Sequence, residues 1–238
     1  RQAWKSGSVP LVPGTRVQED AVGLEALVHA TEGFMNATRL AGSPDPDLEA
    51  SALLDLHSLT WALPSPIAGW SNNWRYTWPR DAAHVLVALH ERGQTEWALD
   101  LLEGLARMQR PDGSFHARYI PGTNRTPDDR PAQFDGVGWL AWAAGRVLAK
   151  GTGPTATTSP AASASPQLVR ALKRAADALM AATETRSHLP AASPDYWEKH
   201  EWQLPLSVAA MTLAGLRACT RLANASVIDS DGSALAAR

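Results

Sequence analysis

Hydrophobic residues recur at helical spacing along most of this chain, and this periodicity restricts its fold more than any other feature. Apolar residues three and four positions apart share one face of a helix, whereas a half-buried strand needs strict alternation. Val and Ile, which favour strands, are sparse beside Ala and Leu. The sequence therefore predicts an all-α fold, with helices at about 19–40, 48–63, 81–92, 95–108 and 135–150, one opened by Ser165 and Pro166, and one at about 206–223.

Three long segments separate these expected helices, and each leads into a helix of the same direction. Helices joined by short turns are antiparallel neighbours, so direction alternates along the chain. The helices that start at Asp81, Asp135 and Pro205 should therefore begin at one common end. Connections longer than roughly 12–15 residues are uncommon and tend to be functional. We therefore expect a functional site where segments 64–80, 111–134 and 187–204 meet.

Residues 1–238 are expected to form a single helical domain, and their composition narrows the classes of partner. A net charge of −2 gives no indication of a nucleic-acid partner. No stretch approaches about 18 consecutive apolar residues, so a membrane span is not expected. Segment 151–165, composed mainly of Gly, Thr, Ser, Pro and Ala, is interpreted as a low-complexity linker inserted between helices.

The cysteine and histidine content gives no indication of a metal or a cofactor. A single cysteine, Cys219, rules out an internal disulfide and a cysteine-based zinc site, and its apolar surroundings predict a buried thiol. The seven histidines show no metal-ligand spacing. The chain opens with Arg1 and no signal-peptide pattern, which we interpret as a processed or cut end. A cytoplasmic and a secreted location both stay open, as does the oligomeric state.

The first long segment combines aromatic residues with an Arg-Asp pair at a predicted helix start. It reads Gly69-Trp-Ser-Asn-Asn-Trp-Arg-Tyr-Thr-Trp-Pro-Arg-Asp81. A sugar site needs aromatic faces against the ring and charged groups that bind hydroxyls, and Trp78, Arg80 and Asp81 provide both. The alternative is that Asp81 caps the helix and Arg80 pairs with it. That alternative leaves the density of aromatic residues unexplained.

The third long segment contains a candidate acid, Glu198, directly after Trp197 in Ser193-Pro-Asp-Tyr-Trp-Glu-Lys-His200. Glycoside hydrolysis needs one carboxylic acid that stays protonated near neutral pH. A Glu packed against Trp gains pKa because the charged form loses its water. A Trp-Glu pair is also common in purely structural roles, so this motif alone decides nothing.

Taken together and in order, these motifs resemble glycoside hydrolase family 15, which contains glucoamylases, glucodextranases and some bacterial trehalases. The resemblance covers roughly residues 53–223. It implies an (α/α)6 barrel, in which six helical hairpins surround a funnel-shaped pocket. The matching motifs are Trp78-Pro79-Arg80-Asp81, Gln133-Phe134-Asp135-Gly136 and Asp195-Tyr196-Trp197-Glu198, together with Met108-Gln109, Asp112-Gly113-Ser114-Phe115 and Arg118-Tyr119.

The resemblance also implies a role for each matched residue. Arg80 and Asp81 would bind the hydroxyls of a terminal, non-reducing glucose. Trp78 and Trp197 would form the walls of that subsite. Glu198 would be the general acid of an exo-acting, inverting hydrolase of α-linked glucosides. The family residue after the acid is often a second Glu that contacts the next sugar, and here it is Lys199. We therefore expect Lys199 to contact the substrate in its place, and recognition of the leaving group to differ.

Two aromatic positions differ from the fungal members of the family. Trp74 is expected to contact the substrate at a position where Tyr is usual in those enzymes. A Trp that contacts the sugars just before the middle motif has no counterpart, because this chain has Asp128-Asp129-Arg130. We therefore expect the back wall of the pocket to differ from that of the fungal enzymes.

An inverting mechanism also needs a second carboxylate that activates water. In the family this base lies in the C-terminal half of the barrel, so we expect the present chain to be an N-terminal part of the domain and inactive alone. One alternative is a non-catalytic carbohydrate-binding or scaffold relic of such a barrel. Another is an (α/α) barrel of different chemistry, such as a lyase or a phosphorylase, although no clustered Arg/Lys loop is evident for a phosphorylase. The linkage, α-1,4, α-1,6 or α,α-1,1, stays open.

Overall fold

A computed structural model of the chain describes residues 21–38, 43–148, 164–195 and 197–237, which form helices joined by loops. They contain no strand, only two isolated β-bridges, Thr77–Tyr119 and Phe115–Gln133. The all-α prediction is therefore confirmed. The helices are α1 (Ala21–Thr38), α2 (Pro46–Thr60), the 3-10 helix η1 (Asn72–Trp74), α3 (Pro79–Glu91), α4 (Thr95–Arg107), α5 (Asp135–Val147), α6 (Pro166–Thr183), α7 (Leu206–Asn224) and α8 (Gly232–Ala236).

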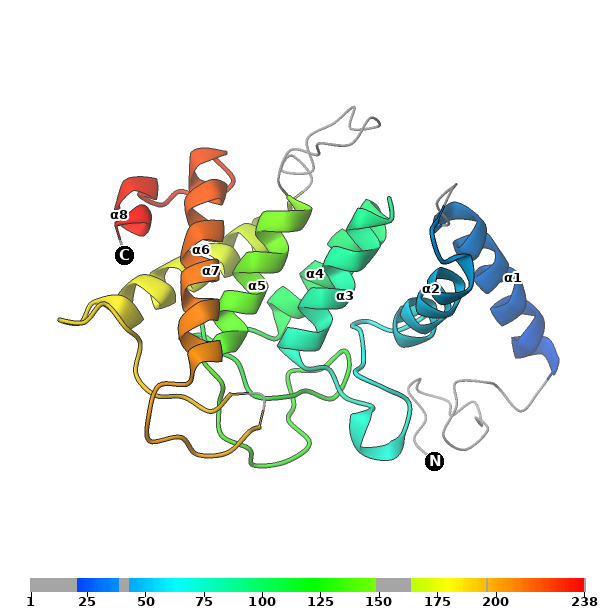
Figure 1. Ribbon diagram of the computed structural model, residues 1–238, viewed down its shortest axis with the longest axis horizontal. Helices are drawn as coiled ribbons and strands as arrows, with labels where there is room; N and C mark the ends of the chain where they lie inside the picture. Colours follow the sequence, from blue (N-terminus) through cyan, green and yellow to red (C-terminus); the bar gives the residue numbers. More distant parts are fainter. Residues whose placement is uncertain (1–20, 39–42, 149–163, 196, 238) are drawn as a thin grey trace.

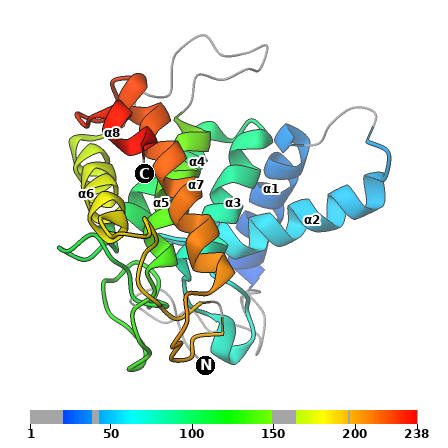
Figure 2. The same ribbon diagram turned by 60° about the vertical axis from the view of Figure 1, so that its left-hand side comes forward.

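Helices α3 to α7 form two packed layers. In Figure 1, α3, α5 and α7 run side by side with α4 and α6 behind them. Figure 2 shows the same arrangement from the side, with α6 beside α5 and α7. Leu and Ala side chains at helical spacing fill the space between the layers, and Cys219 is fully buried among them. Burial raises the pKa of the Cys219 thiol to about 12, as expected for a structural rather than a reactive cysteine.

The contact between α5 and α7 is unusually close because glycines meet there. A Cβ atom on Gly138 would lie 2.2 Å from the backbone oxygen of Met211, and one on Gly215 would lie 2.9 Å from the Cα of Gly138. Such distances leave no space for a side chain. Because Gly138 and Gly215 have no side chain, α5 and α7 can pack at this short distance.

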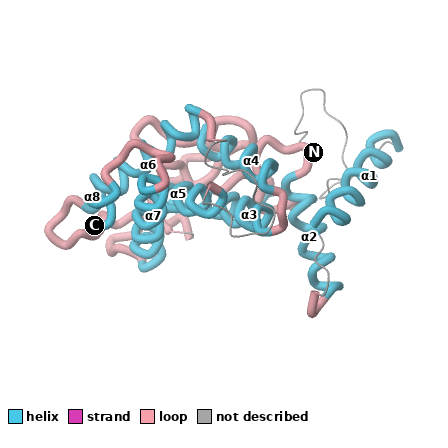
Figure 3. Tube along the Cα trace, turned by 90° about the horizontal axis from the view of Figure 1, so that it is seen from above, coloured by secondary structure: helices cyan, strands magenta, loops and turns pink. Residues whose placement is uncertain are grey.

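Helices α1 and α2 lie at one end of the molecule and α8 at the other (Figures 1 and 3). The ring of Phe34 on α1 meets the ring of Trp97 on α4 edge to face, with centroids 5.5 Å apart. Arg92, just after α3, forms an ion pair of 2.7 Å with Glu49 on α2. These contacts join the α1–α2 pair to the double layer.

Local sequence signals explain where several helices begin. Pro occupies the first helical position of α2, α3 and α6, where its missing N–H costs nothing. The side chain of Ser165 accepts a hydrogen bond of 3.1 Å from the backbone N–H of Leu168 and so caps α6. Ser165 therefore belongs to the helix start rather than to the expected linker, whose residues 151–163 lie outside the described residues.

The remaining predicted helices are present with small differences in length. The helix expected at 48–63 ends at Thr60, and Asp135–Val147 is shorter than the expected 135–150, of which residues 149 and 150 lie outside the described part. The ends of the first predicted helix, residues 19, 20, 39 and 40, also lie outside it. Helix α8 was not predicted, because five residues are too few to show a period.

The three long segments come together at one end of the double layer, at the lower side of Figure 1. Backbone hydrogen bonds join Thr77 and Tyr119, with lengths of 3.0 and 2.9 Å. The backbone N–H of Phe134 donates to Ser193 Oγ at 2.9 Å. The prediction that α3, α5 and α7 start at a common end is therefore confirmed.

Candidate active site

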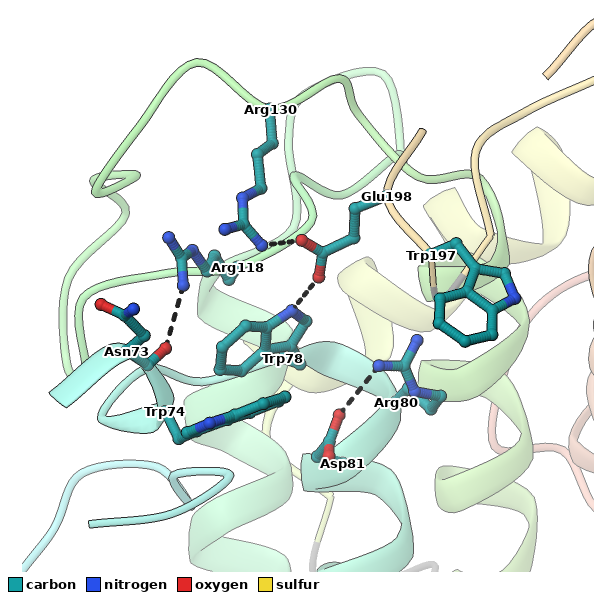
Figure 4. A pocket seen from close by; sticks show the side chains of 9 residues that line it. All are labelled: Asn73, Trp74, Trp78, Arg80, Asp81, Arg118, Arg130, Trp197 and Glu198. Atoms are coloured by element: carbon teal, nitrogen blue, oxygen red, sulfur yellow. Dashed lines mark hydrogen bonds and ion pairs between the residues drawn. The ribbon is translucent and has the colours of Figure 1, made fainter. Parts of the chain in front are cut away.

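A cavity of about 620 Å³ lies where the three long segments meet (Figure 4). All three segments contribute to its wall. It brings together six of the seven residues predicted for the site from the sequence, and adds three others. The lining residues are Asn73, Trp74, Trp78, Arg80, Asp81, Arg118, Arg130, Trp197 and Glu198. Lys199, the seventh predicted residue, is exposed and does not line the cavity.

The start of α3 positions the Arg-Asp pair. The N-cap residue of α3 is Trp78, and its indole makes no capping hydrogen bond. The alternative is therefore wrong in making Asp81 the cap, because Asp81 is the third residue of the first turn, but its other part, a pairing of Arg80 with Asp81, is present. Nη2 of Arg80 lies 3.3 Å from Oδ2 of Asp81. The carboxylate is favourably placed near the positive end of the helix, and the pair faces the cavity (Figure 4).

Three tryptophans form the aromatic part of the wall. Trp78 is buried, and its ring lies 5.8 Å from that of Trp74, tilted by 37°. Trp74 and Trp197 keep 57% and 65% of their surface exposed. Large exposed aromatic faces in a cavity are costly in water and suit a ligand with an apolar surface. The ring of a sugar offers such a surface on its C–H faces.

Glu198 is held by a tight turn of the third segment. Its backbone N–H donates to the carbonyl of Asp195 at 2.9 Å, and Oδ1 of Asp195 accepts from the backbone N–H of Trp197 at 2.9 Å. Glu198 itself adopts a left-handed backbone conformation with φ 57°. That conformation costs a non-glycine residue about 1–2 kcal/mol and is frequent at functional sites. The turn thus fixes the direction in which the Glu198 side chain leaves the backbone.

The carboxylate of Glu198 has one partner on each oxygen. Nε1–H of Trp78 donates a hydrogen bond to Oε1, and Nη1 of Arg130 pairs with Oε2 (Figure 4). The sequence suggested that Glu198 packs against its neighbour Trp197. The structure corrects this, since the tryptophan on the carboxylate is Trp78 and Trp197 is largely exposed. Only 11% of the Glu198 side chain is exposed, so the expected shielding from water is present with a different partner.

A partly buried charge network lies behind this carboxylate. Arg118 pairs with Asp128, donates to the carbonyl of Asn73 at 3.0 Å and lies 4.5 Å from the ring centre of Tyr76. Nε of Arg130 lies 3.1 Å from Oδ2 of Asp128. Burial alone would raise the pKa of Asp128, but the hydrogen bond from Arg118 and the charges of both arginines outweigh it and hold that pKa below its usual value.

Sequence reasoning missed three of the lining residues: Asn73, Arg118 and Arg130. Arg118 belongs to a motif that supported the family resemblance. Arg130 belongs to Asp128-Asp129-Arg130, the stretch in which the fungal enzymes have a sugar-contacting Trp and this chain has none. The sequence showed no clustered Arg/Lys loop. The fold nevertheless gathers Arg80, Arg118 and Arg130 around one cavity from two separate segments.

A second group of contacts involves Asp135 and Gln133, which do not line the cavity but lie next to the segments that form it. Asp135 is buried, and its Oδ2 accepts a hydrogen bond of 3.1 Å from Nε1 of Trp139. Burial raises the pKa of Asp135, an effect only partly offset by that hydrogen bond and by the charge of Arg80. Gln133 donates its amide N–H to the carbonyl of Asp195. The second segment therefore braces the turn that carries Glu198.

Carboxyl groups are few at the cavity. Among the lining residues, all of which lie in the described part of the chain, only Asp81 and Glu198 carry one. Within the described residues no group of three or more His, Cys, Asp or Glu side chains is arranged to hold a metal ion. Nor is any described helix long and apolar enough to cross a membrane.

Comparison of the chain with models of protein families, with curated proteins and with solved structures finds no match. The interpretation of the cavity therefore depends on its residues and their geometry.

Proposed function

We propose that the cavity binds the terminal glucosyl unit of an α-linked glucoside, and that Glu198 is the general acid of an exo-acting, inverting glycoside hydrolase. One observation carries this proposal. A shielded carboxyl group, an Arg-Asp pair and exposed tryptophan faces share one cavity, although they come from segments far apart in the chain.

The binding part of the proposal assigns the sugar contacts. Trp74 and Trp197 offer exposed aromatic faces against the C–H surfaces of the sugar ring. Arg80 and Asp81 offer N–H donors and carboxylate acceptors to its hydroxyls, and such charge-assisted hydrogen bonds are stronger than neutral ones. A neutral, polyhydroxylated ligand uses both kinds of surface.

The catalytic part of the proposal concerns the glycosidic oxygen. Glu198 in its acid form would donate a proton to that oxygen while the bond to the anomeric carbon breaks. Water would attack from the opposite face after losing a proton to a second carboxylate, and the product would be β-glucose from an α-linkage. Asp81 is occupied by Arg80 at 3.3 Å, so it is better suited to binding than to this role.

We further propose that the double layer is part of an (α/α)6 barrel, in which α3, α5 and α7 are inner helices and α4 and α6 are outer helices. In that arrangement the catalytic base would come from helices beyond those described. The proposal therefore assigns sugar binding, but no complete hydrolytic site, to the described residues.

Binding of simple disaccharides tests the proposal. Isothermal titration calorimetry with maltose, isomaltose and trehalose should show binding of at least one of them, while β-linked cellobiose should bind more weakly. Asp81→Asn should weaken the binding about tenfold or more, because it removes charge-assisted hydrogen bonds. Lys199→Gln is the matched control, since Lys199 is exposed and does not line the cavity. Absence of binding to every α-glucoside would refute the proposal.

A second candidate function is carbohydrate binding without catalysis. The observation in its favour is that Glu198 is paired with Arg130, which stabilises the carboxylate rather than the acid. The two candidates differ in a longer form of the protein that carries the remaining helices. A hydrolase releases glucose from the disaccharide that binds, whereas a binding module releases none.

A further inference from the structure

We propose that Arg130 is an ionic latch on Glu198, which covers the carboxyl group in the unliganded site and moves onto Asp128 when a sugar enters. The inference deepens the proposed function and rests on it, because it gives Glu198 the role of an acid. It assigns Arg130 as a positioning residue, not as a group that touches the reacting atoms.

Both oxygens of the Glu198 carboxylate have a partner in the unliganded site. Oε1 faces the indole N–H of Trp78 and Oε2 faces the guanidinium of Arg130. Both partners are donors only, and each leaves its oxygen one further lone pair. The positive charge of Arg130 and both hydrogen bonds favour the ionised form of the carboxyl group. Glu198 therefore holds a proton more readily, and becomes a better acid, after one of the two partners leaves.

The two partners of the carboxylate differ in their freedom to move away from it. Trp78 is 4% exposed and is packed between Trp74 and Tyr76. Arg130 has 37% of its side chain exposed. The open side of the carboxyl group is thus Oε2, and the group that must move is Arg130.

The carboxylate of Asp128 offers the departing Arg130 guanidinium a place to bind. Nε of Arg130 is already 3.1 Å from Oδ2 of Asp128. The other oxygen, Oδ1, is buried and has no hydrogen-bond partner among the described residues. Arginine pairs well with both oxygens of a carboxylate at once. Arg118, whose side chain is only 8% exposed, also pairs with Asp128 and keeps that carboxylate in place.

The charges that face Glu198 come from three parts of the fold. Arg130, Asp128 and Arg118 belong to the second long segment, and Arg80 and Asp81 belong to the start of α3. On the third segment, Asp195 lies in the same turn and the exposed Lys199 follows Glu198 in the chain. Of these groups, Arg130 makes the direct ion pair with Glu198, so its removal should change the titration of Glu198 most.

A different reading is that Arg130 binds the sugar directly. The two readings predict opposite effects of Arg130→Gln on affinity. If Arg130 competes with the sugar for Glu198, its removal strengthens binding by about two- to five-fold, the size expected for a partly exposed ion pair. If Arg130 donates hydrogen bonds to the sugar, its removal weakens binding.

The test combines titration with binding on the full chain. The Glu198 carboxyl carbon is followed by NMR against pH, with its signal identified by its loss in Glu198→Gln. We expect the midpoint to lie at higher pH in Arg130→Gln than in the unmodified chain. Arg125→Gln is the matched control, because Arg125 is exposed, lies in the same segment and does not line the cavity. It should leave the midpoint unchanged.

Calorimetry with the disaccharide that binds best completes the test. Tighter binding by Arg130→Gln, together with the higher midpoint, supports the latch. An unchanged midpoint, or weaker sugar binding, overturns it. If the midpoint rises but neither the unmodified chain nor Arg130→Gln binds any α-glucoside, the proposed function fails while the control of Glu198 by Arg130 is supported. The two failures are therefore distinguishable.

Discussion

The indole N–H of Trp78 hydrogen-bonds the carboxylate of Glu198, although the two residues are 120 positions apart in the chain. Trp78 is the N-cap residue directly before α3, and Glu198 lies in the turn of the third segment. One hydrogen bond thus connects the sugar-binding side of the proposed site to its acid.

Trp78→Phe should disturb this connection while keeping an aromatic ring. The change removes the donor to Oε1 and leaves a small void, so we expect a loss of about 1–3 kcal/mol in the free energy of unfolding. The titration midpoint of Glu198 should rise, because a hydrogen bond to the charged form is lost. Urea denaturation and carboxyl NMR measure the two effects. Trp202→Phe is the control, since Trp202 is 86% exposed and does not line the cavity; an equal loss there would contradict the assignment.

Glu198→Gln should separate catalysis from binding in a form of the protein that hydrolyses α-glucosides. Gln keeps the shape of the side chain but cannot donate a proton, so kcat should fall by about 10²–10⁴-fold while sugar affinity changes little. An aryl glucoside with a good leaving group should be partly rescued. Asp81→Asn, by contrast, should weaken binding as well. Near-normal turnover of a natural disaccharide by Glu198→Gln would show that Glu198 is not the acid.

The 238-residue chain by itself should release little or no glucose. The reason is that the lining residues offer Glu198 and the Arg80-paired Asp81, but no further carboxyl group to activate water. A coupled glucose assay on the monomeric fraction of the chain measures this. Robust release of glucose would mean that a described carboxylate serves as the base.

Gly138→Ala should be strongly destabilising. Its Cβ would meet the backbone oxygen of Met211 at 2.2 Å, so α5 and α7 would have to separate, at a cost of about 3 kcal/mol. Gly33→Ala in α1 is a matched control that should raise the free energy of unfolding rather than lower it. A Cβ there meets nothing within 4 Å, and Ala in a helix interior is better than Gly by about 0.5–1 kcal/mol. Thermal denaturation of both variants checks the pair.

Asp135→Asn should alter how stability depends on pH. Burial raises the pKa of Asp135 in the folded state above its ordinary value of 3.8, so the folded state favours the neutral form. As pH rises from about 3.8 through the higher folded-state pKa, the unmodified chain must ionise a buried carboxyl group. It therefore loses stability relative to Asp135→Asn. Asparagine can still accept the hydrogen bond from Trp139. The advantage of the variant, measured by urea denaturation, should grow from acid to neutral pH. A pH-independent difference would contradict this, and the exposed Asp229 supplies the control substitution.

Most of the helices and the meeting of the three segments could be predicted from the sequence, since both depend on local patterns. Periodicity and start signals such as Ser165-Pro166 are visible in a few neighbouring residues. Alternating direction then places the helix starts of α3, α5 and α7 together without any tertiary detail. The corresponding failure is α8, which is too short to carry a pattern.

The pairing of side chains within the site could not be predicted in this way. The sequence placed Trp197 against Glu198 because they are adjacent, but the tight turn directs them differently and brings Trp78 to the carboxylate instead. It also left Arg130 out of the site, because an ion pair between two loops depends on how both are folded. Lys199 was included on the strength of a family position, and its side chain is exposed outside the cavity.

The cavity wall is assembled from three segments that are attached to different helices, and this has a consequence for how such a site evolves. Segment 64–80 carries Trp74 and leads into the Arg80-Asp81 pair at the start of α3, segment 111–134 carries Arg118 and Arg130, and segment 187–204 carries Glu198. An insertion or exchange in one segment alters one side of the wall and leaves the helical layers beneath it intact. Under the proposed function, the side of the wall that Arg118 and Arg130 form can therefore diverge through the middle segment alone, while the Arg-Asp pair and the acid are inherited unchanged.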